Sequence, residues 1–317
     1  MKKTTVFMFS GQGSQYYHMG RELYTTNSIF KHWMSKMNRM VQQNAGISVL
    51  DEMYNAAIPR YRVFDKLSYT HPAIFMVEYS LACVCMENGI KPDYVLGASL
   101  GEFVAAAVTG ILSVEKALEC LLLQSELVEN NCRQGCMIAI VHNPELYEQT
   151  PAIYGHSELA AVNYSGHFVV SGHRDELMTV GAYLKSKEIL FQELPVRYGF
   201  HSANIDPVEN EYKKILSNFT YKSPAIPFLS CLAAGSIKSI EREHFWNVLR
   251  QPIHFQETIH RLETDNPCMY IDLGPSGTLA NFVKRNLDPD SAAEVYPILS
   301  PFGQDVKKLQ SVLAALH

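Results

Sequence analysis

A serine lies in the segment Gly97–Gly101 (GASLG), which fits the G-x-S-x-G pattern of a nucleophile elbow. An apolar run, Tyr94–Leu96, precedes it, and a helical pattern, Glu102–Thr109, follows it. In such an elbow a strained turn exposes the serine hydroxyl, and the helix N-terminus directs N–H groups at a developing oxyanion. A glycine-rich turn without chemistry would show the same letters, but the flanking strand and helix favour a nucleophile at Ser99.

A second glycine-rich turn, Phe9–Gln15, follows the first apolar run. It lacks the Lys-Ser/Thr pair of a P-loop and the glycine spacing of a dinucleotide site, so an oxyanion N–H near Ser99 explains it better. A serine nucleophile needs a base, and the candidate is His201, in the segment Tyr198–Ser202. A lone histidine in an aromatic segment is, without further context, more often structural.

The elements that must position these residues fall into two groups. Up to about Gly135, strands and long helical patterns alternate, which predicts an α/β layer fold. The order that follows is β-α-β-β-α-β, which is typical of a ferredoxin-like subdomain. Its members are the strands Met137–Val141, Leu159–Val162, Phe168–Ser171 and Leu190–Leu194, a turn or short helix at Asn143–Gln149 and a helix at Asp175–Lys187. After about Tyr198 the chain is expected to return to the larger domain and to end in helices such as Asp305–Leu316.

Composition limits the classes of function. The 317 residues are 47% hydrophobic and 19% charged with a net charge of −5, which fits a globular protein and argues against a nucleic-acid partner. The seven cysteines include no CxxC, and the histidines form no HExxH pair, so neither a disulfide framework nor a metal site is expected. We find no secretory signal. The most apolar stretch, Tyr94–Leu112, is interrupted by Glu102, so we expect no membrane segment and a cytoplasmic protein.

Seven ordered motifs spread over nearly the whole chain carry a family resemblance. They are Phe9–Gln15 (F-P-G-Q-G-S-Q in the family), Thr70–Ala73 (T-Q-P-A), Gly97–Phe103 (G-H-S-L-G-E-[YF]), Asn163–Gly172 (N-x-P-x-Q-x-V-V-S-G), Phe200–Ser202 (F-H-S), Gln251–Phe255 (x-P-V-R-F) and Asp272–Pro275 (E-x-G-P). With these motifs the chain resembles the malonyl-CoA:acyl-carrier-protein acyltransferase family. This resemblance implies an α/β-hydrolase-like core, residues 1–135 and 199–317, with an inserted ferredoxin-like subdomain, residues 136–198. It also implies ping-pong acyl transfer through an acyl-serine.

Carried over by position, the resemblance makes Ser99 the nucleophile and His201 the base. The backbone N–H groups of Gln12 and Leu100 then form the oxyanion hole. The family orients its histidine with a backbone carbonyl, which would lie near Val248. Asp206 is the less favoured alternative for this role.

The most informative departure from the family is Gln124. In the family an Arg at this position holds the carboxylate of malonyl. Gln124 falls on the apolar face of a helix that Ser113 caps and that runs to about Glu129, so it is expected to be buried or to line the pocket. A buried Gln that only joins helices remains the alternative. Arg197 is the cation that could replace the missing Arg, and Arg133 is a weaker candidate.

Other departures point to a reshaped substrate pocket. Ala98 stands where the family has His, and His71 where it has Gln. Ser165 and His167 replace the Pro and Gln of the N-x-P-x-Q motif. With Gln124, they suggest a pocket for acyl groups without a carboxylate. The pocket residues we expect are Gln124, His71, Ala98, Asn163, Tyr198 and Phe200.

These features predict an acyl hydrolase that cleaves acetyl and other carboxylate-free acyl groups from acyl carrier proteins. A subset of the family that lacks the Arg, found with polyketide synthases that use free-standing acyltransferases, has this proofreading role. The alternatives are an acyltransferase that moves malonyl or a neutral acyl group from CoA to a carrier protein, a silent docking protein and a general esterase. The enzyme is expected to be a monomer without a cofactor of its own, since the phosphopantetheine arm belongs to the carrier protein.

Overall fold

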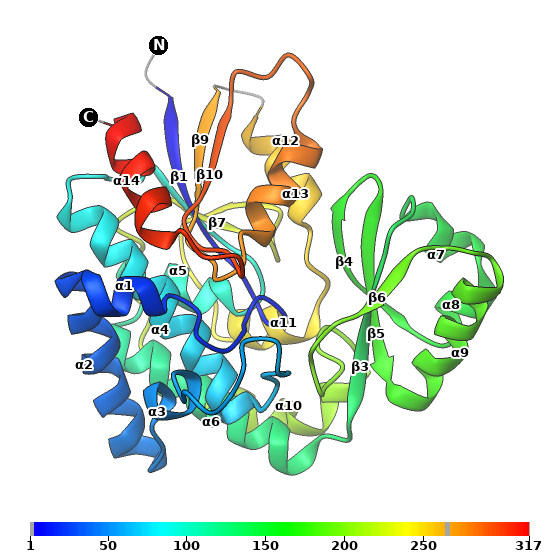
Figure 1. Cartoon of the computed structure of the whole chain (residues 1–317). Coiled ribbons are helices and arrows are strands. Elements are labelled where there is room, and N and C mark those ends of the chain that lie inside the picture. The colour runs from blue at the N-terminus through cyan, green and yellow to red at the C-terminus, as the bar shows by residue number, and fades with distance from the viewer. Residues whose placement is uncertain (1–2, 264–266, 317) are drawn as a thin grey trace.

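The protein, described here by a computed structural model, folds into a larger α/β domain with a smaller lobe beside it (Figure 1). Residues 3–263 and 267–316 are described. The larger domain is built on one six-stranded sheet, in which neighbours are parallel except for the last pair. In spatial order its strands are β10 (Glu294–Pro297), β9 (Cys268–Asp272), β1 (Thr4–Phe9), β2 (Tyr94–Gly97), β7 (Phe228–Ser230) and β8 (Gly235–Ile237).

Helices cover both faces of this sheet because side chains alternate along each strand. Phe7 and Phe9 of β1 belong to the largest hydrophobic core, whereas Val6 and Met8 belong to a second one on the opposite face. The first core includes residues of α1 (Arg21–Thr26), α2 (Ser28–Ala45), α3 (Val49–Met53), α4 (Leu67–Glu87), α5 (Gly101–Val108), α6 (Val114–Asn131), η1 (Ala203–Val208), α10 (Glu209–Leu216), α11 (His244–Arg250) and α14 (Asp305–Leu316). The second includes residues of α12 (Phe255–Leu262) and α13 (Thr278–Asn286).

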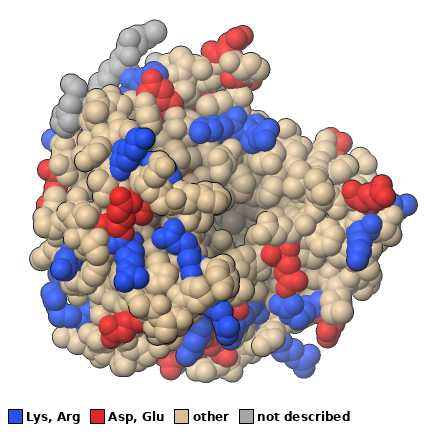
Figure 2. Space-filling view, viewed as in Figure 1, with Lys and Arg blue, Asp and Glu red and all other residues tan. Residues whose placement is uncertain are grey.

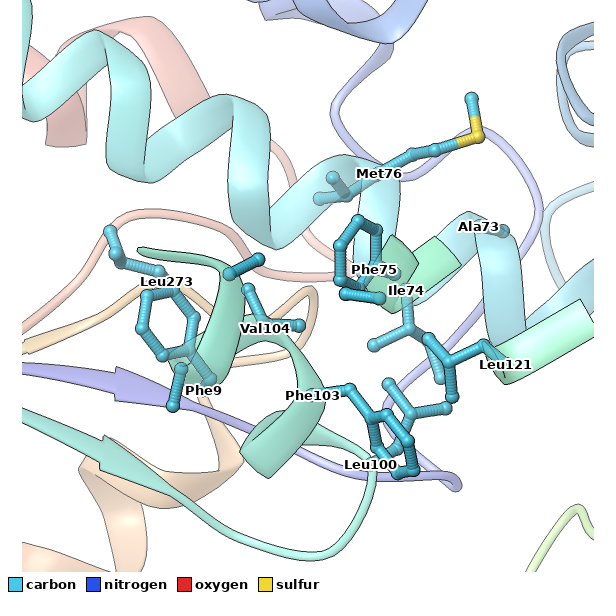
Figure 3. Packing of buried hydrophobic residues seen from close by; sticks show 14 of the residues in the cluster. Phe9, Ala73, Ile74, Phe75, Met76, Leu100, Phe103, Val104, Leu121 and Leu273 are labelled. Atoms are coloured by element: carbon cyan, nitrogen blue, oxygen red, sulfur yellow. The ribbon is translucent and has the colours of Figure 1, made fainter. Parts of the chain in front are cut away.

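Two helices of the first core, α4 and α6, are central to the site. Helix α4 is mostly apolar and buried on nearly all sides, and α6 begins where the Ser113 hydroxyl accepts a hydrogen bond from the Lys116 N–H. Figure 3 shows Ile74 of α4 and Leu121 of α6 packed beside Leu100, at the elbow end of α5. The packing fixes α4 and α6 against the turn that carries Ser99.

The smaller lobe has a four-stranded sheet in the order β4-β5-β3-β6, which is the ferredoxin-like arrangement. Along β3, Met137 and Ala139 face the large core, while Ile138 and Ile140 face a separate core under the lobe's own helices. The lobe comprises β3 (Gly135–Ile140), α7 (Glu145–Gln149), α8 (Pro151–Tyr154), β4 (Glu158–Tyr164), β5 (His167–His173), α9 (Arg174–Ser186) and β6 (Phe191–Glu193).

The predicted fold class, an α/β-hydrolase-like core with an inserted ferredoxin-like subdomain, is confirmed. The lobe's elements run from Gly135 to Glu193, beside the predicted 136–198. Residues 1–2, 264–266 and 317 of the predicted core domain lie outside the described residues. The expectation of helices after Tyr198 was incomplete, because four short strands, β7 to β10, also lie there. No helix among the described residues is long and apolar enough to cross a bilayer.

Candidate active site

Ser99 lies on a tight turn between β2 and α5, with a left-handed backbone (φ 55°). The turn is possible because glycines flank it. A Cβ on Gly101 would lie 2.1 Å from the carbonyl oxygen of Phe9, and one on Gly97 would lie 2.6 Å from the Cα of Glu102. The G-x-S-x-G spacing thus lets β1, β2 and α5 meet closely and holds the serine in a strained backbone conformation.

Replacing Gly101 by Ala should destabilise the fold by about 2 kcal/mol or more, because no flexible side chain can yield to the new methyl group. Urea unfolding would measure the change in the free energy of unfolding. Gly181→Ala in α9 is the matched control. Its Cβ would meet nothing closer than 3.7 Å, so it should stabilise the protein slightly. Equal effects at the two positions would contradict the packing described for the elbow.

Helix α5 is anchored from beneath by a buried glutamate, Glu102. Its carboxylate accepts hydrogen bonds from the Ser230 hydroxyl (2.8 and 2.9 Å), the Leu232 N–H (3.1 Å) and His244 Nε2 (2.7 Å). Three donors therefore satisfy the two buried oxygens, with the single Ser230 proton shared between them. This anchor joins the elbow to β7 and α11, and the sequence interpretation did not identify it.

His201 is the side chain that contacts the Ser99 hydroxyl, with Nε2 lying 2.9 Å from Oγ. On the other side of the ring, Nδ1 lies 2.7 Å from the carbonyl oxygen of Gln251. Since a carbonyl can only accept, Nδ1 carries the proton and Nε2 offers its lone pair to the serine. The arrangement is that of a nucleophile with its base, and a backbone carbonyl orients the base.

The orienting carbonyl belongs to Gln251, so the expected position near Val248 was wrong by three residues. Val248 lies on α11, and the carbonyl that reaches the ring comes from the residue just after this helix ends. Asp206, the alternative, instead accepts a hydrogen bond from Arg250 at 2.6 Å. The chain's path after α11 decides which carbonyl reaches the ring, and no sequence pattern specifies that path.

Burial lowers the pKa of His201 from 6.5 to about 4, although the Gln251 carbonyl opposes this shift. A neutral base should therefore be present across the physiological range. We expect kcat/KM to be constant from about pH 5.5 to about pH 8 and to fall below about pH 4.

The same shift affects stability. Because the unfolded chain binds the His201 proton more tightly, the free energy of unfolding falls as the pH falls from 6.5 to about 4. A rate profile governed by a pKa near 6.5 would contradict this environment for His201.

The turn after β1 lies directly against the serine. A Cβ on Gly11 would be 2.8 Å from the Cβ of Ser99. The backbone N–H groups of Gln12 and Leu100 have no hydrogen-bond partner within the described residues. Two unpaired donors beside a half-buried serine are the arrangement that an oxyanion hole requires.

Buried side chains hold this turn in place. Gln15 accepts from the Gly13 N–H (2.7 Å) and donates to the Phe64 carbonyl (2.9 Å). Behind it, the carboxyl of Glu78 accepts from both the N–H (2.8 Å) and the hydroxyl (2.7 Å) of Ser10. Burial raises the pKa of Glu78 well above its usual range, and the nearby Asp272 carboxyl raises it further. These two contacts tie the turn after β1 to α4, the helix that carries Glu78.

A cleft of about 380 Å³ opens in front of Ser99 and His201, between the larger domain and the lobe. Figure 2 shows the hollow between these two parts of the molecule. Ala98, Asn163 and Phe200 line it, as the sequence predicted, and Asn163 Nδ2 contacts His167 Nδ1 at 3.0 Å. No Lys, Arg, Asp or Glu is among the described residues that line this cleft.

A second, much smaller cavity of about 10 Å³ lies beside the elbow and shares Gln12, Ser99 and Phe200 with the cleft. Gln124 and His71 line it, each with 2% of its surface exposed. The remaining lining residues that the structure describes are apolar, and the cavity therefore has no charged group in its wall. They are Leu100, Phe103, Val248 and Leu249.

Two residues considered for the pocket lie elsewhere. Arg197 pairs with Asp65 at 2.8 Å, is about half exposed and lines neither cavity. The prediction that Tyr198 lines the pocket is not met, because it is absent from both linings and packs its ring edge-on to Phe200. Arg197 is therefore not positioned to replace the family's carboxylate-binding Arg.

Tyr212 is a pocket-supporting residue that the sequence interpretation missed. Its hydroxyl donates to Gln124 Oε1 at 2.9 Å and lies 3.4 Å from Cys120 Sγ. In sequence it is one apolar position of the amphipathic helix α10, where a core tyrosine is the ordinary interpretation. Gln124 on α6 was the available signal, because a buried Gln needs a hydrogen-bond partner and so indicates a polar side chain packed against it.

The chain belongs to the acyl transferase domain family, whose model matches residues 6–317. Among solved structures, it is similar to a loading acyltransferase from the avermectin modular polyketide synthase, with a TM-score of 0.85 and 25% identity, covering 98% of this chain and 99% of that one. It also resembles the acyltransferase domain from the second module of the salinomycin polyketide synthase, with a TM-score of 0.87 and 25% identity, covering 98% and 72% of the two chains.

Two curated relatives match over almost their full length. The polyketide biosynthesis acyltransferase homolog PksD of Bacillus subtilis is 45% identical over 312 residues, which are 98% of this chain and 96% of PksD. The polyketide biosynthesis acyltransferase homolog BaeD of Bacillus velezensis has the same identity and the same coverage. The domain match and these two relatives agree in placing the chain in the acyl transferase domain family.

Proposed function

We propose that this protein is an acyl hydrolase that removes acetyl and other carboxylate-free acyl groups from acyl carrier proteins in polyketide biosynthesis, as a proofreading step. The observation that carries the proposal is the cavity beside Ser99. Gln124 lines it, with its carbonyl oxygen bonded to Tyr212, and no Lys or Arg lies among its described lining residues. The names of PksD and BaeD support the setting in polyketide biosynthesis.

The first half-reaction follows from the contact between Ser99 and His201. Nε2 of His201 takes the hydroxyl proton while Oγ attacks the thioester carbonyl carbon. The N–H groups of Gln12 and Leu100 stabilise the oxyanion, and the Gln251 carbonyl stabilises the protonated ring. The C–S bond then breaks, and the ring returns its proton to the departing thiolate. An acyl-serine and a free thiol are formed.

In the second half-reaction, water takes the place of the departed thiol in the open cleft. His201 removes a proton from the water as it attacks the acyl-serine, and then returns the proton to Ser99 Oγ. The products are a carboxylic acid and the free enzyme. A carrier-protein thiol entering by the same route would give acyl transfer, which is the second candidate function and the one that family membership favours.

The absent cation determines which acyl groups fit. A buried carboxylate that lacks its partner charge is disfavoured by about 3–5 kcal/mol, which is roughly a hundredfold to a few thousandfold in rate. Malonyl should therefore acylate Ser99 poorly, and acetyl should not suffer this penalty.

Hydrolysis and transfer can be distinguished by measuring how the acyl-serine divides between water and a second carrier-protein thiol. The enzyme is incubated with acetyl-carrier protein, with and without an excess of a second, unloaded carrier protein of different mass. The proposal expects acetic acid to form at the same rate in both mixtures and the second carrier protein to remain unloaded. Acetyl accumulating on the second carrier protein, with little free acid, would establish the acyltransferase instead.

A further inference from the structure

The small cavity beside Ser99 presents two polar side chains, His71 from α4 and Gln124 from α6. Each is held from behind by one hydrogen-bond partner, which determines the polar atom that is left for a ligand. The partner of His71 is Ser125, and the partner of Gln124 is Tyr212. The chemistry of the cavity follows from these two contacts.

The contact with Ser125 determines the tautomer of His71. The Ser125 hydroxyl donates its single proton to the Leu121 carbonyl at 2.8 Å, and its oxygen lies 3.1 Å from His71 Nδ1. Nδ1 must therefore carry a proton and donate to that oxygen. Burial lowers the pKa of His71 to about 3, so the ring is neutral. Its Nε2 then has a lone pair and acts as an acceptor.

Gln124 supplies a hydrogen-bond donor opposite this acceptor. Its Oε1 accepts from the Tyr212 hydroxyl, which leaves the amide NH₂ group as a donor. Neither this NH₂ nor His71 Nε2 has a hydrogen-bond partner within the described residues. Phe200, whose ring centroid lies 5.6 Å from that of His71, lines the same cavity and limits the rotation of the imidazole. The cavity thus holds one acceptor and one donor in an otherwise apolar wall.

A hydroxyl group is the simplest neutral group that satisfies both atoms, because it donates one hydrogen bond and accepts another. A cavity of about 10 Å³ has room for about one water-sized group. A plain alkyl tail would leave both polar atoms unpaired, and a carboxylate would direct its oxygens at the lone pair of His71. We propose that this cavity selects short acyl groups that carry a hydroxyl on carbon 2 or carbon 3, with His71 accepting from the hydroxyl and Gln124 donating to it.

This inference deepens the proposed function, and it can be tested on acylation of Ser99 alone. Two matched pairs of carrier-protein thioesters are compared: glycolyl with acetyl, and 3-hydroxypropionyl with propionyl. Release of the free carrier-protein thiol in the first turnover and the acyl adduct on Ser99 are followed by rapid-quench mass spectrometry. In at least one pair the hydroxylated member should acylate Ser99 about tenfold faster, which is the ratio expected for one net hydrogen bond.

The variants His71→Phe and Gln124→Leu each remove one of the two polar atoms. Both should bring the hydroxylated-to-plain ratio close to one, whatever their absolute rates of acylation. His71→Gln, which restores a polar group, should recover part of the preference. The ratio compares two substrates on one preparation, so a partly folded variant remains informative. If one variant gives no soluble protein, the other still decides the outcome.

Two results would overturn the inference: equal rates within both pairs in the wild-type protein, or a preference that survives both His71→Phe and Gln124→Leu. Either result leaves the proposed function standing, because the plain acyl groups would still be released. If Ser99 is acylated and the acyl group then moves to a second carrier protein rather than to water, the proposed hydrolysis fails while the hydroxyl preference stands.

Discussion

Ser99→Ala should abolish release of acyl groups from carrier protein, with a fall in kcat of about 10⁴-fold to 10⁶-fold. The variant keeps the Cβ that the left-handed turn already accommodates, so the fold should remain intact. What is lost is the oxygen that lies 2.9 Å from His201 Nε2, and with it the acyl-enzyme. The rate of free-thiol formation on acetyl-carrier protein, measured by mass spectrometry, gives the effect directly.

The matched control for this variant is Ser217→Ala, since Ser217 is exposed on the surface after α10. It should retain wild-type activity, and both proteins should unfold at the wild-type urea concentration. Residual activity within tenfold of wild type in Ser99→Ala would mean that the nucleophile lies elsewhere. A serine-directed phosphonate should label wild-type protein at Ser99 and leave the variant unlabelled.

Gln124→Arg should raise acylation of Ser99 by malonyl about 10²-fold to 10³-fold and lower acylation by acetyl. The guanidinium would place a positive charge in the cavity wall beside Ser99, where the described lining has none. A carboxylate that enters this site then gains its partner, which is worth about 3–5 kcal/mol when the pair is buried. Competition between malonyl- and acetyl-CoA, with the adduct on Ser99 identified by mass, measures the change.

The cation in Gln124→Arg also costs stability before substrate binds. An unpaired buried charge, together with loss of the bond to Tyr212, should lower the free energy of unfolding of the free enzyme. Malonylation should restore part of it, whereas acetylation should not. Gln124→Met, similar in size and neutral, is the control and should not gain malonyl activity. Malonyl acylation that stays at the wild-type level in Gln124→Arg would show that position 124 does not reach the acyl group.

The strongly patterned parts of the chain could be predicted from sequence. The bounds of α14 were predicted without error, and the lobe's strands were found because alternating apolar residues lie between clear turns. The strands β7 to β10 were missed because they have three to five residues and lack a flanking pattern that separates them from loops. In a parallel sheet such short strands are identified by the strands they pair with, and these partners lie far away in the sequence.

In the candidate active site, too, residues in local motifs could be predicted and those that act across long sequence separations could not. Ser99 lies in a motif whose local spacing specifies its turn, and the resemblance to the acyltransferase family assigned the N–H groups of Gln12 and Leu100 to the oxyanion hole beside it. The Gln251 carbonyl and the Tyr212 hydroxyl act across long sequence separations, on His201 and Gln124, and their residue types carry no signal for these roles. Which backbone carbonyl orients His201 cannot be predicted from residue type, because every residue has a carbonyl. The chain's path after α11 had to be seen first.

The most direct test of the account is mass spectrometry of one carrier protein, loaded separately with acetyl and with malonyl, after incubation with this enzyme. The account predicts that the acetyl form loses its acyl group to give the free thiol, while the malonyl form is largely retained. Retention of acetyl together with efficient loading of malonyl from malonyl-CoA would contradict it. The neutral cavity at Gln124 would then not determine the acyl group, and the protein would be a malonyl transferase.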